Sequence, residues 1–177
     1  GNLNDWSGSE MIQVDQPQYF YEDWDWKGKE DGRFEFGVNS DDENLNIAVR
    51  FTDQKTIIEK GSLKDRQDKF YIHLDANFED DEYQSLEIGV GGMKNSLELT
   101  KIRHKVSLTK TGQILELSIP LEQLSSKLTT DFQKLRINIG IMDHDRPENT
   151  KPSVLWWRPV WGTSADYPQS GMFSISE

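Results

Sequence analysis

Apolar and polar residues alternate along much of this chain, most clearly in its first half. Phe34, Phe36 and Val38 recur at every second position, and the same spacing returns over 45–51. Successive side chains of a strand point to opposite faces, so each segment predicts a strand with one buried face. Between them lies SDDEN (40–44), whose short polar side chains bond readily to the local backbone of a turn. The pattern therefore predicts an antiparallel hairpin over 33–52.

The same period of two predicts further strands at 69–75, 85–90, 96–102, 104–110, 114–120, 134–142 and 172–176. Thr111-Gly112 lies between two of them and indicates a second hairpin. Helix is expected only at 120–128, as one or two turns that begin with Pro120. Many short strands with at most one or two short helices favour an all-β fold. We expect one antiparallel, immunoglobulin-like β-sandwich domain that spans residues 1–177.

The chain is acidic, with 20 lysines and arginines against 31 aspartates and glutamates, a net charge of −11. Proteins bind nucleic acids and anionic lipid surfaces mainly through cationic side chains, so neither partner is expected. No apolar run approaches the roughly 18–20 residues of a membrane span, and we expect no membrane insertion. The absence of cysteine excludes disulfides and thiolate metal sites. A neutral ligand, a cation or a basic protein fits this charge.

Four phrases occur in an order that resembles one protein family. They are NLNDWSG near the start, ENLNIAVRFTD (43–53), DRQDKFYIHLDA (65–76) and RINIGIMDHD (136–145) before a tryptophan-rich tail. Together they are similar to carbohydrate-binding module family 9 and its relatives with a DOMON-like β-sandwich. The resemblance implies that fold, a sugar held between two tryptophans, and calcium ions with a structural role.

The chain departs from the family pattern at two places. Asp65, Arg66 and Gln67 stand where the family shows a tryptophan before its D-S-V-E core. Tyr71 stands where the family shows the glutamate of that core. One half of the aromatic clamp is therefore missing or supplied from elsewhere.

Six tryptophans are the most informative residues for function. A sugar stacks its C–H face on a flat ring, and its hydroxyls need polar partners beside that ring. The segment SVLWWRPVWG (153–162) offers this mixture, and Trp156 and Trp157 would point to opposite faces, one to the core and one to solvent. We expect ligand contacts from Trp157, Trp161, Arg158 and Asp143. The alternative is that these rings plug the open end of the sandwich.

A second aromatic cluster lies in YFYEDWDWKG (19–28). Trp24 and Trp26 share a face if this segment is extended. They form either the opposite wall of a ligand cleft or part of the core. Trp6 matches a family position with a structural role, and we expect it in the core.

Acidic loops offer candidate cation sites, because calcium takes six to eight oxygen ligands from carboxylates and carbonyls. The candidates are SDDEN (40–44), FEDDE (78–82) and DHD (143–145). The family resemblance favours calcium, and we expect it at Asp41, Asp42, Asp143 and Asp145. The alternative is that these acids are solvated turn residues.

The sequence therefore predicts a non-catalytic carbohydrate-binding module for a neutral oligosaccharide or polysaccharide. Its place would be secreted, periplasmic or at the cell surface, as an accessory domain in polysaccharide catabolism. One alternative is a structural or interaction domain of a cell-envelope protein, with every tryptophan structural. Another is a glycan-active enzyme, which needs two carboxylates across a cleft. No catalytic phrase supports that enzyme, and the sequence gives no oligomeric state.

Overall fold

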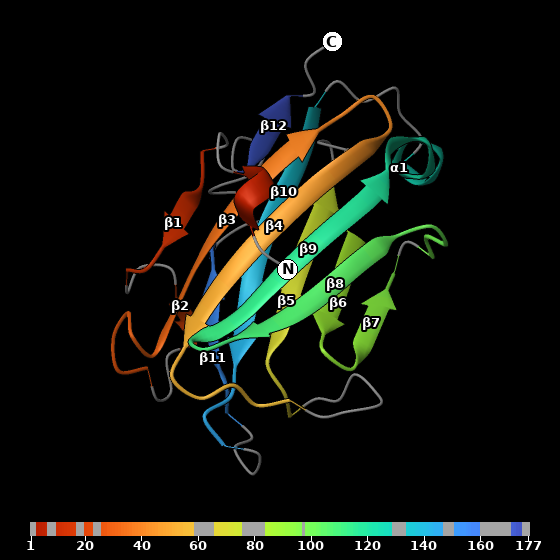
Figure 1. Cartoon of the computed structure of the whole chain (residues 1–177). Helices are drawn as coiled ribbons and strands as arrows, with labels where there is room; N and C mark the ends of the chain where they lie inside the picture. The colour runs from red at the N-terminus through yellow and green to blue at the C-terminus, as the bar shows by residue number, and fades with distance from the viewer. Residues whose placement is uncertain are drawn as a thin grey trace.

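Two antiparallel sheets pack face to face and form a β-sandwich (Figure 1). The structure is a computed structural model that describes residues 3–6, 10–16, 20–22, 26–58, 66–75, 84–96, 98–128, 134–146, 151–159 and 171–174. Helix is confined there to a 3-10 turn, η1 (Leu3–Trp6), and to α1 (Leu121–Leu128). The prediction of an all-β sandwich with very little helix is confirmed. Neither helix has the length and apolar character that crossing a membrane requires.

Sheet A, in front in Figure 1, holds five strands in the order β1 (Ile12–Val14), β3 (Gly32–Ser40), β4 (Asn44–Asp53), β9 (Gly112–Pro120), β8 (Arg103–Thr109). Sheet B lies behind it, in the order β2 (Phe20–Glu22), β11 (Ser153–Trp156), β10 (Lys134–Asp143), β5 (Lys69–Asp75), β6 (Gln84–Gly89), β7 (Gly92–Asn95). The short strand β12 (Met172–Ser174) also pairs with β10.

The core lies between the sheets and is made by the apolar half of each alternating strand. On β4 the residues Leu45, Ile47, Val49 and Phe51 are all buried, as the sequence predicts. The long strand β10 contributes Leu135, Ile137, Ile139 and Ile141 from the other side. Burial of these side chains is the main force that holds the two layers together.

Both predicted hairpins are present. In the first, β3 and β4 pair in continuous register over nine residue pairs, from Gly32 with Asp53 to Ser40 with Leu45. In the second, Gly112 begins β9 with φ +134°, and a Cβ at this position would lie 2.2 Å from the carbonyl oxygen of Phe51. Only glycine combines this backbone angle with so close an approach.

The predicted strand at 96–102 is wrong. β7 instead ends at Asn95, and Glu98 takes a left-handed conformation with φ 52° that no strand accepts. The side chain of Asn95 donates a hydrogen bond to the carbonyl of Leu99, at 2.9 Å, and so closes a turn. The helix predicted at 120–128 is confirmed as α1, directly after Pro120.

Candidate functional site: an aromatic face and a buried carboxylate cluster

Trp157 lies in the core, and the solvent exposure that the sequence predicted for its ring is wrong. Its side chain is 8% exposed and packs edge-on against Phe36 and tilted against Phe173, with centroid separations of 5.0 and 5.9 Å. The Arg158 guanidinium carbon lies 4.5 Å from the centre of the Trp157 ring. Arg158 thus packs against the buried Trp157 ring through a cation–π contact.

The neighbouring Trp156 points the opposite way, onto the outer face of sheet B, as expected for consecutive residues of a strand. It is half-buried and lies over Gly140, its register partner on β10. A Cβ at Gly140 would come within 2.4 Å of the indole, so the missing side chain is what lets the ring lie against the sheet. The sequence therefore separates the two tryptophans correctly but assigns the ligand role to the buried one.

Tyr71 and His73 on β5 complete an aromatic group with Trp156. The centroid of Trp156 lies 4.6 Å from that of His73 and 5.6 Å from that of Tyr71, with tilted planes. Burial lowers the pKa of His73 to about 4. Its imidazole is therefore neutral near pH 7, where one ring nitrogen can donate a hydrogen bond and the other can accept one.

Charged side chains continue the same face beyond the rings. Tyr71 is the register partner of Glu87 on β6, and Glu87 is the partner of Lys94 on β7. The ammonium groups of Lys69 and Lys94 lie 3.6 and 3.5 Å from one carboxylate oxygen of Glu87. The outer face of sheet B thus joins flat rings to fixed donors and acceptors, which is the combination that a sugar requires.

Three buried carboxylates meet at one end of the sandwich. Asp53 ends β4, Asp143 ends β10, and Asp68 directly precedes β5. One oxygen of each lies within 4.8 Å of the others, and all three residues are at most 4% exposed. Because β4 belongs to sheet A while β5 and β10 belong to sheet B, this carboxylate cluster spans both layers.

The hydrogen bonds around the cluster leave several oxygens without a partner. Asp68 accepts from the backbone N–H groups of His144 and Ile57, at 3.0 and 2.8 Å, and from the Gln113 amide at 3.3 Å. Asp53 Oδ2, Asp143 Oδ1 and Gln113 Oε1 are buried with no hydrogen-bond partner. Gln113 itself is fully buried. Buried polar atoms are normally satisfied, so these oxygens need an explanation.

The pKa values of the carboxylates also indicate that the cluster needs a positive charge or protons. Burial raises the pKa of Asp68 to about 8 and that of Asp143 to about 9. The charged groups that raise the Asp143 pKa further are other carboxylates, those of Asp68, Asp53, Asp145 and Asp31. Like charges so close together in a buried place are unfavourable unless a cation or protons neutralise them.

The donor set fits a calcium ion. Asp53, Asp143, Asp68 and Gln113 supply carboxylate and amide oxygens from four separate segments, which are the ligands that hard cations prefer. The half-buried Trp26 borders the cluster: its Nε1 donates to the Gly32 carbonyl at 3.0 Å, and Gly32 also lies against the Asp143 carboxylate. Trp26 thus stands beside the cluster.

The other predicted calcium residues divide between this cluster and the opposite end of β4. Asp145 is half-buried and lies 3.8 Å from the ammonium of Lys27. Asp41 and Asp42 are exposed in the β3–β4 turn, a strand length of roughly 30 Å from Asp53. Asp41 accepts hydrogen bonds from the backbone N–H groups of Glu43 and Asn44. Its carboxylate is therefore occupied by its own turn, and the structure does not bring it to Asp143.

Trp24, Trp161 and the acidic loop 78–82 lie outside the residues that the structure describes. Sequence reasoning missed Asp53, Asp68, Gln113, Trp156 and the pair Tyr71 and His73 as site residues. The sequence does mark the three acids of the cluster, because an end of an alternating segment is occupied in each case by Asp53, Asp68 or Asp143. Which strand ends meet is decided by topology.

No protein-family model and no curated protein matches this sequence. Solved structures do match. A carbohydrate binding module family 9 from Caldicellulosiruptor kristjanssonii in complex with cellotriose superposes with a TM-score of 0.67 at 12% identity, over 98% of this chain and 85% of that one. The same organism's family 9 module in complex with glucose gives 0.64 at 13% identity, over 88% and 78%.

A third match is described as a putative carbohydrate-binding protein from Bacteroides uniformis ATCC 8492. It has a TM-score of 0.65 at 15% identity, over 98% of this chain and 89% of that one. At these identities the likeness concerns the fold. The chain therefore has the fold of a family 9 carbohydrate-binding module, as the sequence phrases suggested.

Proposed function

We propose that this chain is a non-catalytic carbohydrate-binding module whose ligand is a neutral glycan bound on the outer face of sheet B. The observation that carries the proposal is the ring of Trp156, which lies over Gly140 beside Tyr71 and His73. The fold likeness to modules solved with cellotriose and glucose supports it. A polysaccharide ligand would place the protein outside the cytoplasm, in polysaccharide catabolism.

The binding chemistry would combine stacking with oriented hydrogen bonds. Trp156 and Tyr71 offer flat apolar surface to the C–H face of a pyranose. Neutral His73 and the carboxylate of Glu87 are candidates to bind ring hydroxyls. Each hydroxyl bond replaces a bond to water, so its net contribution is about 1 kcal/mol, and affinity would be moderate.

The test is isothermal titration of the whole chain with cello-, xylo- and manno-oligosaccharides. We expect heat with at least one series, and a loss of affinity of at least about tenfold in Trp156→Ala, because the truncation removes the apolar ring surface on which a sugar stacks, worth roughly 25 cal/mol per Å² buried. Leu108→Ala, a truncation of an exposed apolar side chain on sheet A, is the matched control. Absence of heat with every series would favour a structural or interaction domain, and release of reducing sugar would favour an enzyme.

We also propose that the carboxylate cluster holds a calcium ion with a structural role. Bound there by Asp53 from one layer and Asp68 and Asp143 from the other, calcium would supply the positive charge that the buried oxygens require and would tie the two sheets together. The test is calcium titration by calorimetry after chelation. One site that disappears in Asp143→Asn supports the proposal, and the absence of any site refutes it.

A further inference from the structure

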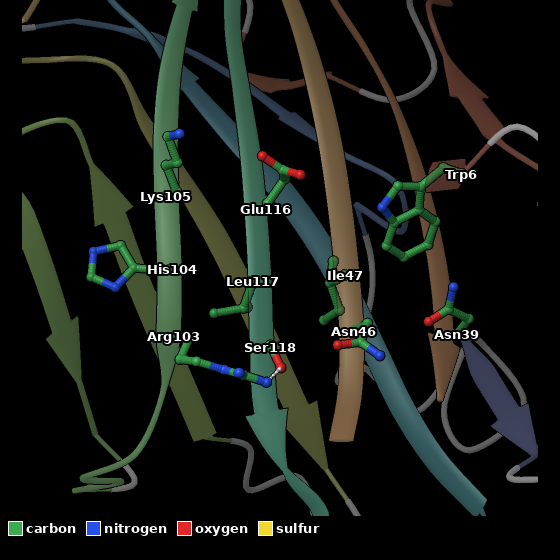
Figure 2. Close-up of a pocket in the computed structure, with 10 residues that line it drawn as sticks. All are labelled: Trp6, Asn39, Asn46, Ile47, Arg103, His104, Lys105, Glu116, Leu117 and Ser118. Carbon is green, nitrogen blue, oxygen red and sulfur yellow. Dashed lines mark hydrogen bonds between the residues drawn. The ribbon is translucent and has the colours of Figure 1, made fainter. Parts of the chain in front are cut away.

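The outer face of sheet A carries a hollow that the proposed function does not use. Its volume is about 390 Å³, within the range of small-molecule sites, and it lies over β3, β4, β9 and β8 (Figure 2). Trp6 stands at one side, and the polar lining residues are Asn39, Asn46, Arg103, His104, Lys105, Glu116 and Ser118. Sheet B, with the aromatic face, is the opposite layer of the sandwich.

Strand register sets the lining residues in rows. Asn39 pairs with Asn46, Asn46 with Ser118, and Ser118 with Arg103, so four polar side chains cross four strands in one line. Arg103 reaches along this row and donates a hydrogen bond to Ser118 Oγ at 3.2 Å (Figure 2). Amide, hydroxyl and guanidinium groups in one line offer successive hydrogen-bonding positions to an extended polar chain.

The next row of register partners, two residues along each strand, forms the floor and one wall of the hollow. Gly37 pairs with Ala48, Ala48 with Glu116, and Glu116 with Lys105. The small Gly37 lets Trp6 rest on the sheet, because a Cβ there would lie 2.9 Å from the indole. Trp6 is half-buried and lies beside β3 on the outer face of sheet A, so the prediction that it belongs to the core is wrong (Figure 2). A partly exposed ring at the edge of a polar hollow is a surface on which a sugar can stack.

The charge of this hollow is opposite to that of the whole chain. From residue 99 to residue 115 the sequence has no acid but contains Lys101, Arg103, Lys105 and Lys110. Residues 101, 103 and 105 alternate with their neighbours, and Arg103 and Lys105 both line the hollow. Among the described residues that line the hollow, Glu116 is the only acid. In a chain with net charge −11, this cationic strand favours a ligand that carries negative charge.

We propose that this hollow is a second binding site, for an oligosaccharide that bears carboxylates, such as one built of uronic acid residues. Arg103 and Lys105 pair with the carboxylates, Asn39, Asn46 and Ser118 bind hydroxyls, and Trp6 stacks against one ring. Guanidinium and ammonium groups recognise carboxylates through charge-assisted hydrogen bonds. The site goes beyond the proposed function, because its residues come from sheet A and from η1, and none of them belongs to the aromatic face.

The test is calorimetric titration of the whole chain with tetragalacturonic acid, with cellotetraose as the neutral ligand of equal length. We expect the acid to bind, to weaken as salt rises, and to lose at least about tenfold in affinity in Arg103→Ala/Lys105→Ala. Lys110→Ala, which removes an exposed cation of the same strand pair outside the hollow, is the matched control and should leave affinity unchanged. Trp156→Ala should also leave acid binding unchanged.

Each remaining result overturns the proposal. These results are no binding of the acid, equal affinity for the acid and the neutral ligand, or an equal loss in Lys110→Ala, which would show unspecific attraction to cations. Because Trp156→Ala and Arg103→Ala/Lys105→Ala act on opposite sheets, failure of this site leaves the proposed site on sheet B untouched, and the reverse also holds.

Discussion

The outer faces of the two sheets come from strands with the same alternation of apolar and polar residues, yet their polar side chains differ in exposure to solvent. On sheet A, Arg50 bonds to Glu35 with side chains 46% and 20% exposed. On sheet B, Arg136 bonds to Asp75 at 3.0 Å with side chains 0% and 2% exposed. Polar residues that alternate with core residues along a strand therefore do not show by themselves that the outer face of the sheet meets solvent. The difference is tertiary: the outer face of sheet A carries an open hollow, while the outer face of sheet B carries half-buried rings beside a fully buried ion pair.

The largest expected effect separates these two ion pairs. Arg136→Met should lower the free energy of unfolding by about 3–5 kcal/mol, since it leaves the carboxylate of Asp75 buried without the cation that faces it. Arg50→Met, the same change on sheet A, should cost no more than about 1 kcal/mol, because water can solvate Glu35. Urea denaturation of both variants measures the contrast. Equal losses would mean that the two faces do not differ as described.

The next effect concerns the carboxylate cluster that joins the two layers. Calcium at about one hundred times its dissociation constant should stabilise the chelated protein by about 2.7 kcal/mol. Asp143→Asn should abolish this gain, because it removes one of the oxygens that face the site. Thermal denaturation with calcium and with a chelator is the measurement, and magnesium at equal concentration is the control. If calcium did not change the melting temperature of the unmodified chain, the proposed calcium site at the carboxylate cluster would be contradicted.

The same cluster predicts a dependence on pH with a definite sign. Burial raises the pKa of Asp68 to about 8 and that of Asp143 to about 9, against about 3.9 for an aspartate in an unfolded chain. Without calcium the folded state therefore holds more protons between about pH 4 and pH 9, and its stability falls as pH rises through that window.

Calcium reverses this loss, because it binds the deprotonated carboxylates and competes with their protons. We expect the melting temperature of the calcium-free protein to drop between about pH 5 and pH 8, and calcium to raise it more at the higher pH. A calcium effect that is larger in acid than at pH 8 would be inconsistent with carboxylate ligands.

Two matched glycine variants compare the ligand binding of the two outer faces. Gly140→Ala should displace Trp156 and weaken neutral-glycan binding by about tenfold, while Gly37→Ala should displace Trp6 and weaken binding of the acidic glycan alone, because each loses apolar ring contact with its sugar. Both residues have backbone angles open to alanine, so the added methyl group acts through its neighbours: the Trp156 ring at Gly140, and the Trp6 ring together with the Met11 sulfur at Gly37. Overpacking should also cost each variant about 1–3 kcal/mol. Titration of both ligands against both variants would expose any cross-effect.

The smallest effect is expected at the turn where the sequence placed part of a calcium site. Asp42 is exposed in the β3–β4 turn, a strand length away from the carboxylate cluster. Asp42→Asn should change stability by less than about 0.5 kcal/mol and leave the calcium response intact. A reduced response in this variant would return the turn to consideration as a cation site.

Local patterning determined most of the strands, both predicted hairpins and the opposite directions of Trp156 and Trp157. These follow from side-chain periodicity and turn chemistry, which act over a few residues. The phrases of the sequence also indicated the fold of a family 9 carbohydrate-binding module, and the structure has that fold. The failure at 96–102 has a local cause of a kind that alternation cannot reveal, the left-handed backbone at Glu98.

Tertiary structure alone decided which residues meet. Asp53 and Asp143 are ninety positions apart in sequence, 143 − 53, and come together because β4 and β10 end at the same end of the sandwich. Likewise, the burial of Arg136 and the contact of Trp6 with Gly37 depend on what packs over each sheet. A period of two tells which side chains share a face, but only the packing of distant segments tells whether that face meets water, a partner charge or a ring.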